Sequence, residues 1–128
     1  MKNTETQNDV FGALADLLLP VLPKDWQNVC LYSQINEMSY EFFFYVKSNN
    51  VYTQCFDLEK DYGISRKEFR DAFKAMYKVL LPEQKEKKWF AMTFLLSCDG
   101  KFSAEYEYKD YSENTLEYKE LWKQKYLV

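Results

Sequence analysis

Two blocks of this sequence show the two-residue alternation typical of β-strands, and a block with helical spacing separates them. The first alternating block covers about residues 28–58 and the second about residues 89–108. Because successive side chains of a strand point to opposite faces of its sheet, this period indicates strands and not helices. Turn signals interrupt both blocks, so we expect each block to form a meander of antiparallel strands.

Five strands are predicted within these blocks, and their β-branched and aromatic residues support the assignment. They cover about residues 28–35, 40–47, 51–58, 89–97 and 102–108. Asp99 and Gly100 separate the last two strands, and Asp-Gly is a preferred pair for a tight primed turn. Ser48-Asn49-Asn50 is a second turn signal.

The segment between the two blocks predicts an amphipathic helix. Ser65 is a good N-cap, and Glu68, three residues later, completes a capping box. Apolar residues at spacings of three and four form the expected buried stripe, which consists of Phe69, Phe73, Met76 and Leu80. We expect Pro82 to end this helix, because proline lacks the N–H that a helix interior needs. Residues 83–88 are then expected to form a charged loop.

Two further helices are predicted near the ends of the chain. One covers about residues 7–19, before Pro20 and Pro23, and the other covers about residues 113–126. The element order is therefore α-β-β-β-α-β-β-α, and a length of 128 residues is typical of one domain. We predict a single α+β domain over residues 1–128, with an antiparallel sheet of about five strands and helices packed on one face.

Histidine is absent from the chain, whereas aromatic residues make up 19% of it. Without imidazole there is no Ser-His or Cys-His nucleophile and no histidine metal ligand. Only three glycines are present, and no glycine-rich loop that could cradle a phosphate is found. We expect no catalytic residues, no metal and no cofactor, and the many aromatic side chains favour a binding protein.

The cysteines indicate the compartment in which the protein works. Cys30, Cys55 and Cys98 are odd in number and far apart in sequence, which disfavours a disulfide framework or a zinc ribbon. Reduced and mostly buried thiols are typical of the cytoplasm. The N-terminus lacks the apolar core of a signal peptide, and no apolar run approaches the roughly 20 residues of a membrane helix. We expect a cytoplasmic protein that is a monomer or a weak dimer.

A basic middle segment lies within a chain whose net charge is −3. Its helix carries cations at spacings of four, namely Arg66, Arg70, Lys74 and Lys78. Such a stripe is usually a solvated helix face. The alternative function is a nucleic-acid or phosphate-binding module that uses this stripe, although general affinity for nucleic acid needs a larger positive field.

The strand alternation also predicts which side chains point away from the helices. The aromatic residues expected to face the helices are Phe42, Phe44, Phe90, Phe94 and Phe102. The opposite face then carries a mixture of aromatic, aliphatic and acidic side chains: Tyr32, Glu41, Phe43, Tyr45, Leu95, Glu105 and Glu107. Either the C-terminal helix or a partner protein covers this face. A basic partner suits it, because carboxylates steer the encounter and aromatic rings anchor it.

Glu105 and Glu107 project from the same face of one strand. A carboxylate pair of this kind could perform acid–base chemistry, which would make the protein a small hydrolase. A solvated strand face explains the same pattern more simply. We therefore expect that the protein is not an enzyme.

Several short motifs follow one another along nearly the whole chain. The first are Pro23-x-x-Trp26-x-x-Val29, Leu31-Tyr32, Glu41-Phe42-Phe43-Phe44-Tyr45, and Asp61-Tyr62-Gly63-Ile64-Ser65 followed by Phe69. The later ones are Trp89, Thr93-Phe94, Gly100-Lys101-Phe102, Tyr106-x-Tyr108-x-Asp110-Tyr111 and residues 121–127. In their order and spacing these motifs resemble the YezG-like immunity proteins, antitoxins to secreted nuclease toxins of Gram-positive bacteria.

The resemblance implies an immunity protein without catalytic residues that acts in interbacterial competition. Its expected partner is a cognate toxin, secreted or delivered by contact, in which a basic nuclease domain has its active site or substrate cleft occluded. Strand alternation and charge select the expected partner-binding residues: Tyr32, Glu41, Phe43, Tyr45, Asp57, Asp61, Glu105, Glu107 and Asp110. The loop before Trp89 is shorter, and the strands are more aromatic, than in typical members, so the identity of the toxin is not implied.

Overall fold

A single antiparallel sheet organises the protein. The computed structural model describes residues 2–58 and 63–127, with side chains from residue 9 onward. The strands are β1 (Asn28–Ile35), β2 (Tyr40–Ser48), β3 (Val51–Gln54), β4 (Ala91–Ser97) and β5 (Phe102–Glu107). They lie in the order β3-β2-β1-β4-β5, and every neighbouring pair is antiparallel. The predicted α+β class and element order are confirmed.

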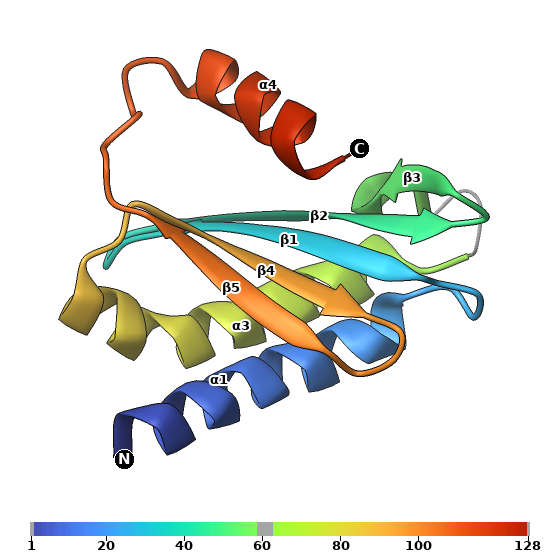
Figure 1. The fold of residues 1–128 in the computed structure, drawn as a ribbon, viewed down its shortest axis with the longest axis horizontal. Helices are drawn as coiled ribbons and strands as arrows, with labels where there is room; N and C mark the ends of the chain where they lie inside the picture. The colour runs from blue at the N-terminus through green and yellow to red at the C-terminus, as the bar shows by residue number, and fades with distance from the viewer. Residues whose placement is uncertain (1, 59–62, 128) are drawn as a thin grey trace.

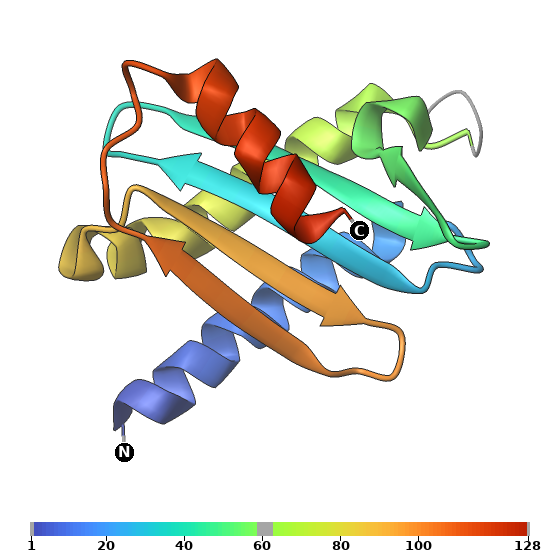
Figure 2. The same cartoon turned by 45° about the horizontal axis from the view of Figure 1, so that its top comes forward.

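The helices lie on both sides of this sheet. They are α1 (Lys2–Leu18), α3 (Arg66–Lys87) and α4 (Thr115–Tyr126), with short 3₁₀ turns at η1 (Leu19–Val21) and η2 (Cys55–Asp57). Helices α1 and α3 cover one face together, as expected, and α4 crosses the opposite face (Figures 1 and 2). Of the two explanations for the outer face, the structure therefore selects coverage by the C-terminal helix.

The main core lies between the sheet and the pair α1 and α3. Leu31 on the central strand is paired with Phe44 on one side and Phe94 on the other, and all three are fully buried. The predicted stripe of α3, Phe69, Phe73, Met76 and Leu80, is buried against this face. Each large apolar side chain removed from water in this way contributes about 1.5–3 kcal/mol to the driving force for folding.

The start of α3 matches the sequence prediction, but its end does not. Ser65 Oγ accepts a hydrogen bond from the Glu68 amide, and Glu68 Oε2 accepts one from the Ser65 amide, which confirms the capping box. The expectation that Pro82 ends the helix is wrong, because α3 continues through it to Lys87. Contacts to the sheet hold this last part, where the Tyr106 hydroxyl donates to Glu83 Oε1 at 3.0 Å. Tertiary contacts thus outweigh the local cost of proline.

The turn predicted at Ser48-Asn49-Asn50 is confirmed, whereas the Asp99-Gly100 turn differs from its predicted form. Asn49 and Asn50 both have positive φ angles and close a two-residue loop between β2 and β3, so the primed-type geometry occurs there. The Asp99-Gly100 hairpin instead closes between Ser97 and Lys101, which makes it a three-residue loop with Gly100 at a φ of 89°. The predicted third strand is also too long, because the chain turns into η2 after Gln54.

The starts of α1 and β4 also differ from the sequence prediction. Helix α1 begins at Lys2 and not near Gln7, since a polar first turn carries no apolar period to reveal it. Strand β4 begins at Ala91, and the alternation expected from residue 89 breaks before it. Phe90 therefore lies beside Tyr111 and Tyr118 on the α4 side, and not on the side of α1 and α3.

Candidate binding site

Trp122 fixes α4 to the outer face of the sheet. Its side chain is 3% exposed, and its indole N–H donates to Thr93 Oγ1 on β4 at 2.8 Å. The indole also meets the rings of Tyr32 and Phe43 edge to face, at centroid distances of 5.7 and 5.3 Å. A buried Trp needs a partner for its N–H, and a threonine at this position supplies one. The outer face is therefore a second packed layer.

Two of the predicted partner-binding residues are buried in this layer. Tyr32 and Phe43 stack with ring centroids 4.7 Å apart and are at most 8% exposed. The Tyr32 hydroxyl donates to Gln34 Oε1 at 2.7 Å, and burial raises the pKa of Tyr32. This corrects the expectation that both rings are exposed anchors, because α4 occupies the space where a partner was expected. Tyr45 remains half-buried at the side of Trp122.

Two of the predicted carboxylates also hold α4. Glu41 on β2 forms an ion pair with Lys119, and Glu105 on β5 forms one with Lys125 at 3.3 Å. The Tyr126 hydroxyl donates to Glu105 Oε1 at 2.5 Å. This hydrogen bond, together with Lys125, holds the pKa of the Glu105 carboxyl below its ordinary value. The helix is therefore fixed at both of its long sides by charges on the sheet.

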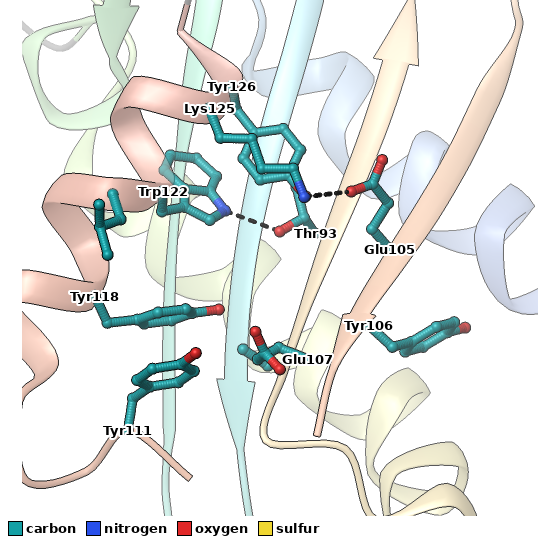
Figure 3. A pocket seen from close by; sticks show the side chains of 11 residues that line it. Thr93, Glu105, Tyr106, Glu107, Tyr111, Tyr118, Trp122, Lys125 and Tyr126 are labelled. Carbon is teal, nitrogen blue, oxygen red and sulfur yellow. Dashed lines mark hydrogen bonds and ion pairs between the residues drawn. The ribbon is translucent and has the colours of Figure 1, made fainter. Parts of the chain in front are cut away.

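A groove of about 210 Å³ remains between α4 and the strands β4 and β5 (Figure 3). Its aromatic wall includes Tyr118 and Trp122 from α4 and Tyr111 from the loop before it. Tyr111 and Tyr118 stack with ring centroids 4.3 Å apart. Glu105 and Glu107 line the side formed by the edge strand β5. The groove therefore combines aromatic surface with two carboxylates.

Glu107 lies at the end of the groove where the hydroxyl ends of Tyr111 and Tyr118 point toward it (Figure 3). Its Oε2 accepts hydrogen bonds from the amides of Tyr108 and Lys109, at 3.1 and 3.2 Å. Among the residues that the structure describes, no cation forms an ion pair with this carboxylate. Burial and the charge of Glu107 raise the pKa of Tyr118 to about 12, so its hydroxyl stays protonated at neutral pH.

The remaining predicted site residues that the structure describes lie outside this groove. Asp57 is exposed in η2, which follows β3 at the opposite edge of the sheet from β5. Asp110 is exposed before α4, and its Oδ1 accepts a hydrogen bond from the Ser112 amide at 2.8 Å. Hydrogen bonds from Ser112 hold the pKa of Asp110 below its ordinary value. Asp61 lies outside the described residues.

The structure thus brings Glu105 and Glu107 together as expected and adds three aromatic residues that the site prediction did not include. These are Tyr111, Tyr118 and Trp122. The spacing of four between Tyr118, Trp122 and Tyr126 predicted one face of a helix. That spacing could not show which face of the sheet the helix covers, and therefore could not place these rings beside the two carboxylates.

A family model for YezG-like immunity proteins matches residues 7–128 of the chain. This chain belongs to the YezG-like immunity protein family. A curated relative, the immunity protein YezG of Bacillus spizizenii (strain ATCC 23059 / NRRL B-14472 / W23), is 26% identical over 116 residues. That alignment covers 84% of this chain and 72% of the relative. The resemblance inferred from the motifs is confirmed, and the matched region includes the whole groove.

Other surface features of this YezG-like protein are less suited to a site. A larger hollow of about 490 Å³ at the C-terminal end of α4 has Lys101 and Lys125 as its charged lining residues. A third hollow of about 320 Å³ between α1 and α3 contains Asp16, Glu68 and Asp71 and no aromatic side chain. Glu68 is engaged in the capping box, and Asp71 pairs with Lys67 at 3.9 Å. Glu107 differs from these carboxylates because it faces a groove with an aromatic wall.

The basic stripe of the YezG-like protein lies on α3, across the sheet from the groove (Figure 1). Its members Arg66, Arg70, Lys74 and Lys78 are all exposed, as a solvated helix face requires. Within residues 2–58 and 63–127, no three cysteine or carboxylate side chains are arranged to hold a metal ion. No helix in the same ranges is both long and apolar enough to cross a membrane.

Proposed function

We propose that this protein binds a cognate toxin domain in the cytoplasm of the producing cell and neutralises it without catalysis. Membership of an immunity protein family supports the toxin partner, and a curated relative carries the name of an immunity protein. We further propose that the toxin is a cationic nuclease and that this protein occludes its active site or substrate cleft. The observation that carries this proposal is the Glu107 carboxylate in an aromatic groove, without an ion-pair partner among the described residues.

The chemistry of the groove complements that of a nuclease. A cleft that binds nucleic acid presents lysine and arginine to the phosphates of its substrate. The carboxylates of Glu105 and Glu107 attract such a surface and repel the phosphates that compete for it. Aromatic side chains at the centre of an interface supply most of its binding energy, and Tyr111 and Tyr118 are placed to do so.

A rigid binding surface lowers the entropy cost of association. The groove has one wall on the sheet and another on α4, and the contacts of Trp122, Lys119 and Tyr126 fix the helix to the sheet. In this arrangement Tyr32 and Phe43 do not contact the toxin directly. Their rings pack against Trp122 and hold it in place. The proposed direct contacts in the groove are Glu105 and Glu107. Tyr45, Glu41, Asp57, Asp61 and Asp110 stay proposed partner contacts, and of these Asp57 lies at the opposite edge of the sheet from β5.

Co-expression with a candidate toxin tests this function. The probe is the C-terminal domain of the protein encoded in the reading frame next to this gene, expressed from an inducible promoter in a bacterial host. We expect growth arrest with the domain alone, normal growth with both proteins, and a stable complex on size-exclusion chromatography. If no toxic domain is encoded there, a pull-down from the native host identifies the candidate. A toxic partner that forms no complex and is not neutralised would contradict the proposal.

A further inference from the structure

Strand β5 forms one end of the sheet and pairs with β4 on one side only. The Lys101 carbonyl accepts a hydrogen bond from the Ser97 amide at 2.9 Å, and the Glu107 carbonyl accepts one from the Phe90 amide at 2.6 Å. The odd-numbered residues of this segment therefore direct their backbone groups toward β4. In an antiparallel strand the alternate residues face the other way. The N–H and C=O groups of Phe102, Ala104 and Tyr106 consequently point to the open edge.

This open edge is well formed for pairing with another strand. The register of β4 and β5 leaves the amides of Phe102, Ala104 and Tyr106 without a backbone acceptor among the described residues. The strand is six residues long and contains no proline, whereas β3 at the other edge has four residues and runs directly into η2. An unpaired edge of this kind is a template for an added strand, and natural proteins usually protect it.

Charge decides which strand can pair there. Glu105 and Glu107 point from β5 to the α4 side, where residues of an added strand would be their cross-strand neighbours. A second copy of β5 would bring its own glutamates to this side, and neighbouring like charges destabilise strand pairing. Nucleic acid is also disfavoured, because its phosphates carry the same negative charge as the two glutamates. A strand with lysine or arginine at alternate positions meets opposite charges instead.

We propose that a β-strand of the toxin domain adds to the open edge of β5 and places an arginine or lysine side chain in the groove at Glu107. The proposal rests on the proposed function and specifies how the partner is held. Backbone hydrogen bonds from Phe102, Ala104 and Tyr106 supply affinity, and the groove supplies specificity. The aliphatic part of the basic side chain lies against the tyrosine and tryptophan rings, and its charged end pairs with the Glu107 carboxylate.

The groove shows why the carboxylate and not the ring face receives the cation. The Lys109 ammonium already lies over the Tyr111 ring at 5.1 Å, and the same ring stacks on Tyr118. Tyr111 therefore already has a cation partner. Glu105 is engaged with Lys125 and Tyr126, which leaves Glu107 as the carboxylate of the groove that is able to bind a further cation.

Amide hydrogen exchange on the complex with the toxin domain tests strand addition directly. We expect exchange to slow at least tenfold at Phe102, Ala104 and Tyr106 when the complex forms, while Tyr52 and Gln54 on β3 stay unchanged. A complex that protects the α3 stripe or β3 but leaves these three amides unprotected would overturn the proposal and leave the proposed function intact. A toxin domain that forms no complex would contradict the proposed function instead.

Two pairs of variants separate the backbone and side-chain contributions. Ala104→Pro removes one outward N–H without breaking the pairing with β4, because this amide faces the open edge. We expect it to weaken toxin binding at least tenfold, whereas Ala104→Ser keeps the amide and stays within about twofold. Glu107→Gln preserves the acceptor for the local amides but removes the charge, and weakens binding by about tenfold. Glu86→Gln, on an exposed part of α3, is its matched control.

A short peptide that alternates lysine and threonine provides a probe that does not depend on the toxin. We expect NMR shifts of the β5 amides on addition of this peptide, and none with a peptide in which glutamate replaces lysine. Circular dichroism and thermal unfolding confirm that each variant is folded before its affinity is measured. Equal binding of both peptides, or equal toxin affinity of Ala104→Pro and Ala104→Ser, contradicts strand addition.

Discussion

The indole N–H of Trp122 and the hydroxyl of Thr93 form a 2.8 Å hydrogen bond between α4 and the centre of the outer sheet face. The two residues are 29 positions apart in sequence. The indole is 3% exposed, and its ring also contacts Tyr32 on β1 and Phe43 and Tyr45 on β2, so one side chain joins the C-terminal helix to three strands. This contact therefore helps to hold α4, one wall of the groove, against the sheet.

Truncation of Trp122 is expected to destabilise the protein strongly. Trp122→Ala removes the buried ring and leaves the Thr93 hydroxyl without its donor, so we expect a loss of about 3–5 kcal/mol in the free energy of unfolding. Urea denaturation followed by circular dichroism measures it. Leu121→Ala is the control, because Leu121 is 55% exposed on the same helix. Equal stability of the two variants would show that α4 does not depend on this contact.

The Tyr106–Glu83 hydrogen bond is expected to stabilise the end of α3. Glu83 is 9% exposed. Burial of the Tyr106 hydroxyl raises its pKa most, and the charge of Glu83 raises it further. Tyr106→Phe removes the donor and leaves this carboxylate poorly solvated, at a cost of about 1–3 kcal/mol. We expect amide exchange to accelerate in α3 beyond Pro82. Tyr108→Phe, at a 59% exposed position, is expected to change neither quantity.

The Glu105 carboxylate makes the docking of α4 depend on pH. Its pKa is below the ordinary value of 4.5 in the folded protein, because the Tyr126 hydroxyl and Lys125 stabilise the charged form. Its contribution to stability is therefore present above about pH 4.5 and is lost as the pH falls through the lower folded value.

Denaturation of the wild type and Glu105→Gln between pH 7 and pH 2 tests this dependence. We expect the wild type to be more stable at neutral pH and the difference to shrink in acid. The control substitution is Glu86→Gln on α3, for which we expect a difference that does not depend on pH in this way. A constant difference between wild type and Glu105→Gln at all pH values is the contrary result.

The three cysteines are expected to react at different rates. Cys98 is exposed, whereas Cys30 and Cys55 are buried and burial raises the pKa of each thiol to about 11. Since the thiolate is the reactive form, a thiol reagent at pH 8 should modify Cys98 rapidly and the other two only after unfolding. Mass spectrometry over time measures this. Three equal rates in the native protein would contradict the burial of Cys30 and Cys55.

The basic stripe is expected to play no part in neutralisation. Lys74 and Lys78 are exposed on α3, on the other side of the sheet from the groove. Lys74→Ala combined with Lys78→Ala should therefore leave toxin protection unchanged. Fluorescence anisotropy with labelled DNA at low salt should show no binding by the wild type. Salt-dependent DNA binding that this double variant abolishes would favour the nucleic-acid alternative.

Local features of the chain predicted most of the fold. The period of two gave the strands, and the Ser65–Glu68 capping box gave the start of α3, because both patterns depend on residues close in sequence. Local reasoning failed at Pro82, where contacts from Glu83 to Tyr106 and from Gln84 to Trp89 extend the helix. Local reasoning also placed Phe90 on the wrong face of the sheet. The alternation breaks before β4, and Phe90 packs against the distant Tyr111 and Tyr118.

The site was predicted less completely than the fold. Strand alternation placed Glu105 and Glu107 on the outer face, and in the structure both line a groove on that face, which the alternation did not predict. The same alternation placed Tyr32 and Phe43 on that face correctly, but their exposure depends on what lies above them. The spacing of Tyr118, Trp122 and Tyr126 showed that a helix had an aromatic side, but it did not show where that side packs.

The sequence by itself determined the five strands, the three helices, the absence of histidine chemistry and the position of two carboxylates on one strand face. Only the tertiary structure decided that α4 covers the outer face, that Trp122 meets Thr93, and that Glu107 faces an aromatic groove beside an open strand edge. Secondary structure follows from local backbone and side-chain preferences. The placement of α4 follows from competition between distant apolar surfaces for burial, which no short segment of the chain contains.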